Sequence, residues 1–227
     1  MPFNLQTFKT RTLTAIIFAL IMVGGLLLNT WSFVLLFTII HFGCWYEFIK
    51  LLKKISSQKY IYYLPTGLVY ITLPVLIMIY IRTAGFLVWN SNYFMFLLLP
   101  CFIVFSIWIN DTMAYIVGSF IGKTPFSKIS PKKTWEGTIG GIILCVGIIA
   151  LAGWYTHFYK LNTWIVIGAI CAIFGTIGDL LESKLKRMAQ VKDSGSIMPG
   201  HGGFLDRFDS LLIATPFVWL YLYFIIG

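Results

Sequence analysis

The chain has 227 residues, of which 59% are hydrophobic and only 11% charged, with a mean hydropathy of +0.86 and a formal net charge of +9. This composition excludes an ordinary soluble domain. Apolar runs of bilayer length recur from Leu13 to Ile226 and leave no room for a separate soluble module, so we expect one integral membrane unit.

Seven apolar segments are long enough to cross a bilayer. In chain order they cover residues 12–28, 30–49, 60–80, 93–110, 138–156, 163–180 and 209–226. A long apolar run in lipid satisfies its own backbone groups as an α-helix. We therefore predict an all-α, multi-pass transmembrane protein with about seven spans, eight being the alternative. Residues 1–227 form a single domain, in which 1–92 supply N-terminal spans and 93–227 carry the candidate site.

Two segments of the chain are irregular. Pro65 and Pro74 in the third run predict its start and a kink, because proline lacks the N–H that a helical hydrogen bond needs. Residues 111–122 are apolar but too short to span. Three placements stay open for them: an interfacial helix, an extension of the fourth span, or half of a hairpin.

The charged residues fall on one side of the predicted spans. With the N-terminus in the cytosol, 15 of the 17 Lys and Arg residues lie on the cytosolic side, and only Arg82 and Lys160 lie outside. This asymmetry predicts an N-in, C-out orientation with an odd number of spans. The eight acids also fall on or near the cytosolic side, although topology makes no such demand on them: Glu47, Asp111, Glu136, Asp179, Glu182, Asp193, Asp206 and Asp209. Both signs of charge in one layer indicate a functional site, the alternative being that charge simply avoids lipid.

Three carboxylates near the last two spans are candidate metal ligands. Asp179 ends the sixth span, where a carboxylate is costly unless it is paired, hydrated or holding a cation. Asp206 and Asp209 are three residues apart at the start of the last helix, which puts them on one helix face. Helix capping is the alternative for these two acids, and an acid reaching water is the alternative for Asp179. If the last two helices are neighbours, the three carboxylates can share a magnesium ion.

The segment KDSGSIMPGHGGFLDRFD at 192–209 adds bases and glycines to these acids. The basic side chains can neutralise phosphate, and the amides of a glycine-rich loop can bind phosphate oxygens. His201 can act as an acid, as a hydrogen-bond donor to phosphate, or as a turn residue. Together with Asp193, the acids and the bases, these are the components of phosphoryl or nucleotidyl transfer.

A second polar segment, SPKKTWEGTIGG at 130–141, lies on the same predicted side. Lys132 and Lys133 can meet an anionic substrate or lipid head groups. Trp135 can stack on a base or lie in the aromatic belt of the membrane. Glu136 can bind ribose, a metal or a lysine.

The pattern resembles the phosphatidate cytidylyltransferases, also called CDP-diacylglycerol synthases. Their signature corresponds here to Ser183, Leu185, Lys186, Arg187, Lys192, Asp193, Pro199, His201, Gly202, Gly203, Asp206, Arg207 and Asp209. Asp111, SPKKTWEG and GDLLES also resemble family sequence, so the resemblance covers roughly the C-terminal half.

The resemblance implies magnesium-dependent transfer of CMP from CTP to phosphatidate, giving CDP-diacylglycerol and pyrophosphate. It implies magnesium ligation by Asp179, Asp206 and Asp209, with a second cation left open. The expected catalytic residues are Asp179, Lys186, Arg187, Lys192, Asp193, His201, Asp206, Arg207 and Asp209. The expected substrate-binding residues are Asp111, Lys132, Lys133, Trp135, Glu136, Ser183, Gly202 and Gly203. We expect the bacterial inner membrane, a site facing the cytosol and no nucleic-acid partner, and leave a homodimer open.

Two other functions are less consistent with these residues. An ion-coupled transporter would carry polar groups near mid-membrane in several spans, whereas the charge here lies at one interface. A CDP-alcohol phosphotransferase would carry an aspartate-rich DxxDG-type helix, whereas Asp209 is followed by Ser210.

Overall fold

The computed structural model describes residues 5–87, 93–197 and 202–225, and these form long helices. The elements are α1 (Leu5–Leu27), α2 (Thr30–Ile55), α3 (Tyr60–Gly67), the π-helical turn η1 (Leu68–Thr72), α4 (Leu73–Leu87), α5 (Tyr93–Ile121), α6 (Trp135–Thr156), α7 (Leu161–Met188) and α8 (Leu205–Ile225). Among these residues the strand-like pairing is an isolated bridge between Pro125 and Thr134. The predicted all-α class is confirmed.

The third predicted segment is one continuous run of α3, η1 and α4. The π-helical turn lies between Pro65 inside α3 and Pro74 in the first turn of α4. A proline removes one backbone donor, and a locally wider turn is one way in which a helix accommodates that loss.

The described residues contain five helices that are long and apolar enough to cross a membrane. These are Thr30–Ile55, Tyr60–Thr83, Phe96–Ile121, Trp135–Thr156 and Leu161–Met188. Thr12–Leu27 is a shorter apolar helix. Several apolar helices of this length indicate a multi-pass membrane protein, while the total of seven spans and the orientation stay predictions.

Residues 111–121 extend the fourth predicted span, which is one of the three placements left open. Helix α5 runs without interruption to Ile121. Small residues on α6 let the two helices approach closely, since a Cβ atom on Gly141 would lie 2.7 Å from the Cβ atom of Ala114. The C-terminal half of α5 is therefore packed against α6.

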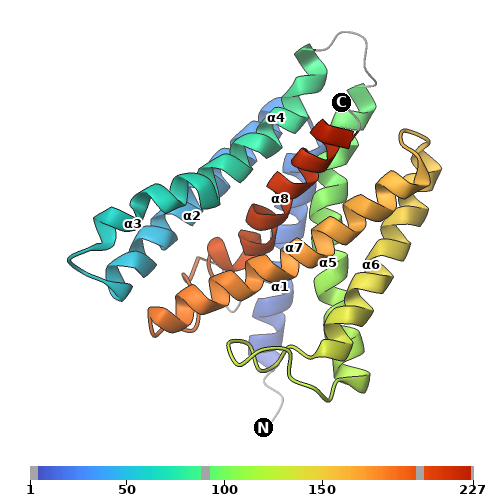
Figure 1. The fold of residues 1–227 in the computed structure, drawn as a ribbon. Coiled ribbons are helices and arrows are strands. Elements are labelled where there is room, and N and C mark those ends of the chain that lie inside the picture. Colours follow the sequence, from blue (N-terminus) through green and yellow to red (C-terminus); the bar gives the residue numbers. More distant parts are fainter. Residues whose placement is uncertain (1–4, 88–92, 198–201, 226–227) are drawn as a thin grey trace.

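The polar loops gather toward one end of the helix bundle (Figure 1). The α2–α3, α5–α6 and α7–α8 connections lie toward the bottom and lower left of the view, and the α6–α7 hairpin and the end of α8 lie toward the top. The charged segments of the sequence thus share one end of the molecule, as their distribution predicts.

Candidate functional site

A cavity of about 740 Å³ opens at this polar end. Its walls are α5, the loop before α6, α7, the loop after α7 and the start of α8. The predicted site residues that line it are Asp111, Lys132, Lys133, Asp179, Lys186, Lys192, Asp193, Gly202, Asp206, Arg207 and Asp209. Residues from segments far apart in the sequence therefore meet in one cavity.

Other predicted site residues lie beside the cavity. Ser183 donates a hydrogen bond of 3.3 Å to Asp179 Oδ1 one helical turn away. Arg187 is exposed in the last turn of α7. The N–H group of Gly203 donates a hydrogen bond of 2.7 Å to Asp206 Oδ2. His201 lies outside the described residues.

Trp135 and Glu136 shape the loop that carries the cavity's lysines. The Trp135 ring packs edge-on against Phe126. Glu136 accepts hydrogen bonds from the N–H groups of Lys123 and Thr124, at 3.1 and 3.2 Å, and from the Thr124 hydroxyl at 2.8 Å. In this structure Glu136 fastens the start of the loop to α6, and its use in substrate binding stays a prediction.

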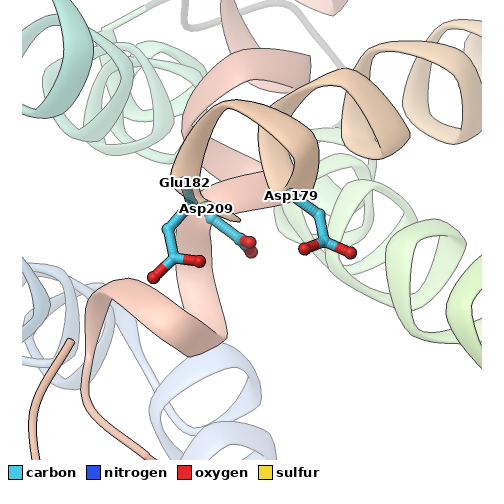
Figure 2. A group of neighbouring side chains, drawn as sticks. All are labelled: Asp179, Glu182 and Asp209. Carbon is cyan, nitrogen blue, oxygen red and sulfur yellow. The ribbon is translucent and has the colours of Figure 1, made fainter. Parts of the chain in front are cut away.

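Three carboxylates form a cluster at the cavity wall, which Asp179 and Asp209 line and behind which Glu182 is buried. Asp179 and Glu182 come from α7 and Asp209 from α8, with one oxygen of each within 4.8 Å of the others. Figure 2 shows Asp209 between the two α7 acids. The helices approach closely because residue 178 is glycine, where a Cβ atom would lie 2.9 Å from Ser210 Cα.

The proximity of Asp179 and Asp209 agrees with the predicted metal set, whereas Glu182 was not predicted. The sequence feature that indicates Glu182 is its spacing of three residues from Asp179, because this spacing places both acids on one helix face. The acidic segment GDLLES holds both residues.

The cluster brings together three carboxyl groups, and two lysines form ion pairs with it. Lys133 forms an ion pair with Asp179, and Lys186 forms one with Glu182. The Glu182 side chain is fully buried, and its Oε1 has no hydrogen-bond partner in the described structure. Asp209 is also buried. Since buried like charges repel strongly, and hard divalent cations prefer carboxylate oxygens, these acids could hold a magnesium ion.

Asp206 stands apart from this cluster and joins α7 to the following loop. Its Oδ1 accepts from Lys186 Nζ at 2.6 Å, and its Oδ2 accepts from the N–H groups of Ser194 and Gly203 at 2.9 and 2.7 Å. Burial alone raises the pKa of Asp206, which precedes the predicted last span. The Gly203 N–H and the Lys186 ammonium outweigh burial and lower that pKa below its usual value.

The turn before Asp206 requires glycine. Gly202 has a φ of +84°, and a Cβ atom there would also lie 2.9 Å from the carboxyl carbon of Asp206. The glycine therefore allows the chain to fold back so that the Asp206 side chain reaches the loop amides.

The chemistry of the cavity suits a ligand rich in phosphate. Lys132, Lys192 and Arg207 line it beside Lys133, together with Asp179 and Asp209 of the carboxylate cluster. Basic groups can bind phosphate oxygens while a cation on the carboxylates neutralises others.

Comparisons with known proteins agree with this chemistry. A model of the cytidylyltransferase family matches residues 68–225. The phosphatidate cytidylyltransferase of Staphylococcus aureus (strain COL) is 49% identical over 113 residues, which are 48% of this chain and 43% of that protein. The Synechocystis sp. protein of the same name is 46% identical over 118 residues, 51% of this chain and 40% of that protein. The chloroplastic phosphatidate cytidylyltransferase 4 of Arabidopsis thaliana is 44% identical over 113 residues, 49% of this chain and 29% of that protein. The match spans less than half the length of each of these relatives.

Proposed function

The chain belongs to the cytidylyltransferase family, and from this premise we propose that it transfers CMP from CTP to phosphatidate, giving CDP-diacylglycerol and pyrophosphate. The observation that carries the proposal is the cavity, in which lysines and an arginine lie beside Asp179 and Asp209, two of the three clustered carboxylates. All residues that line it lie between 110 and 210, inside the part of the chain that the family model matches.

The proposed nucleophile needs little activation. A phosphate oxygen of phosphatidate is already ionised near neutral pH, so a strong general base is unnecessary. The barrier comes from bringing this anion to the α-phosphorus of CTP, which is itself a polyanion. Lys132, Lys133, Lys192 and Arg207 can bind the two groups and reduce their repulsion in a partly closed cavity.

We propose that Asp179, Glu182 and Asp209 hold magnesium. When bound, the ion would neutralise phosphate charge and stabilise the departing pyrophosphate. For Asp206 we propose a different contribution, because Lys186 and the loop amides occupy its oxygens. By holding Lys186 beside Glu182, it sets the position of a cation next to the cluster.

The place of the cavity suggests how two different substrates reach it. The polar end of the bundle faces the cytosol in the proposed orientation, so CTP enters from water. The acyl chains of phosphatidate remain among the exposed apolar side chains of the helices. The proposed location is a bacterial inner membrane, with the reaction at its cytosolic face.

The proposal is tested by measuring pyrophosphate release from CTP by the purified protein in mixed micelles. We expect release to require both phosphatidate and magnesium, and to stop when a chelator removes the cation. Diacylglycerol in place of phosphatidate is the matched control, because it lacks the nucleophilic phosphate. Release that is equal with either lipid, or that is unaffected by the chelator, would contradict the proposal.

A further inference from the structure

Glu47 lies on α2, outside the region that the family model matches, yet it reaches the loop that borders the cavity. It is 3% exposed. Its Oε1 accepts from the Phe204 N–H at 3.0 Å, and its Oε2 accepts from the Leu205 N–H at 2.9 Å. Leu205 begins α8, and the first N–H groups of a helix have no partner within the helix. The Glu47 carboxylate accepts these hydrogen bonds, although it lies 158 positions before Leu205 in the chain.

Ser194 connects Glu47 to Asp206. Its hydroxyl oxygen lies 2.7 Å from Glu47 Oε2 and 2.8 Å from Asp206 Oδ2, and it can donate its proton to either carboxylate. Its N–H donates to Asp206 Oδ2 at 2.9 Å. Asp206 in turn accepts from Lys186, which pairs with Glu182 of the carboxylate cluster. A continuous series of polar contacts therefore runs from α2 to the proposed metal ligands.

The loop backbone lies directly against the Glu47 carboxylate. A Cβ atom on Gly195 or on Gly203 would collide with this carboxylate, so a larger residue at either position would displace the Glu47 side chain from its hydrogen bonds. Gly195 and its neighbour Ser196 also line the cavity. The backbone of the loop at Gly195 therefore lies between Glu47 and the cavity.

From these contacts we infer that Glu47 is a positioning residue of the active site, which fixes residues 194–195 and 203–205 and through them Asp206 and Lys186. The inference rests on the proposed function. It gives the N-terminal half a defined part in the reaction, although the described cavity lining comes entirely from residues 110–210.

The test replaces Glu47 by glutamine, which keeps the shape but presents an NH₂ group to at least one of the three donors. We expect Glu47→Gln to lower kcat by about 10- to 100-fold, the range for lost outer-shell contacts, while KM for CTP changes by less than about threefold. Tyr46→Phe is the matched control, because Tyr46 is the preceding residue on α2 and its side chain is 70% exposed. A kcat of Glu47→Gln within about twofold of the wild type overturns the inference.

Hydrogen–deuterium exchange separates positioning from general destabilisation. In Glu47→Gln we expect faster exchange in peptides covering 203–206, with unchanged protection of α7. Faster exchange throughout α2 and α7 would assign Glu47 a purely structural role and overturn the inference. This readout needs no activity, so an inactive wild type would defeat the proposed function alone, while unchanged exchange at 203–206 would defeat the inference alone.

Ser194→Ala decides the question if Glu47→Gln does not fold. This variant leaves the two backbone N–H groups that donate to Glu47 in place and removes only the hydroxyl between the carboxylates. For Ser194→Ala alone we expect a fall in kcat of about 3- to 10-fold without a change in thermal stability. Where Glu47→Gln does fold, we also expect the double variant to lose no more kcat than Glu47→Gln alone. Unchanged kcat in Ser194→Ala, or a double variant whose losses multiply, would contradict the inference.

Discussion

Asp209 is the residue on which the proposed chemistry depends most directly. It is buried between Asp179 and Glu182, and a carboxylate in that position is tolerable only with compensating positive charge. We expect Asp209→Asn, in purified protein, to lower kcat by about 100-fold or more, because removal of one electrostatic contributor to a transition state costs several kcal/mol. Steady-state kinetics check this, with helical content by circular dichroism as the folding control. Near-normal turnover in both Asp209→Asn and Asp179→Asn would remove the proposed ligand set.

Lys133 is expected to act on substrate affinity. It lines the cavity and pairs with Asp179, whereas Lys128 in the same loop is exposed and outside the cavity lining. We expect Lys133→Gln to raise KM for CTP or phosphatidate by about tenfold, equivalent to about 1.4 kcal/mol of binding. Lys128→Gln, the matched control, should leave both constants unchanged. If Lys133→Gln and Lys128→Gln have the same KM values for CTP and for phosphatidate, the Lys133–Asp179 ion pair has no part in substrate binding.

At the scale of single residues, the sequence was informative where residues are close in the chain. The spacing of Asp206 and Asp209 and the position of Asp179 predicted that these acids lie near one another, and the structure places all three in the lining of one cavity. Spacing could not show that Asp206 turns back to Ser194 and Gly203, because that depends on the glycine at 202 and its positive φ. The roles of the metal ligands remain predictions.

The approach of α7 to α8 sets the geometry of the cluster at the scale of elements. A Cβ atom on Gly178 would collide with the backbone of α8, whereas one on Gly175, one turn earlier, would make an ordinary contact of 3.5 Å with Ser210 Cβ. We therefore expect Gly178→Ala to lower both thermal stability and kcat, because the helices must separate. Gly175→Ala is the matched control and should retain wild-type values. If both variants behave alike, close packing at Gly178 does not position the acids.

Helices were the part of the fold that hydrophobicity predicted best. Five of the seven predicted apolar segments lie within a helical segment. Segment 12–28 ends one residue beyond α1, and segment 209–226 ends one residue beyond the described part of α8. The extension of α5 to Ile121 could not be decided from the sequence, because it depends on packing against the glycines of α6. Likewise the link from Glu47 to Phe204 and Leu205 is a contact between distant segments, and no local pattern indicates it.

For the whole molecule, the predicted orientation can be tested by chemical labelling. The four native cysteines are buried and free, so a single introduced thiol can report the side on which it lies. We expect a membrane-impermeant maleimide to label Lys128→Cys only in inside-out vesicles and Lys160→Cys only in right-side-out vesicles. These positions lie in the α5–α6 and α6–α7 connections, toward opposite ends of the bundle (Figure 1). Labelling of both from the same side would contradict the N-in, C-out orientation.

The molecule combines a cavity lined by charged residues with an apolar helical body, as the proposed pair of substrates requires. The most direct test is to follow radiolabel from CTP into lipid with the purified protein, phosphatidate and magnesium. Label at the α-phosphate should enter a chloroform-soluble product and label at the γ-phosphate should not, and Asp209→Asn should abolish the incorporation. Transfer of the γ-label, or α-label incorporation that survives Asp209→Asn, would contradict cytidylyl transfer at this site.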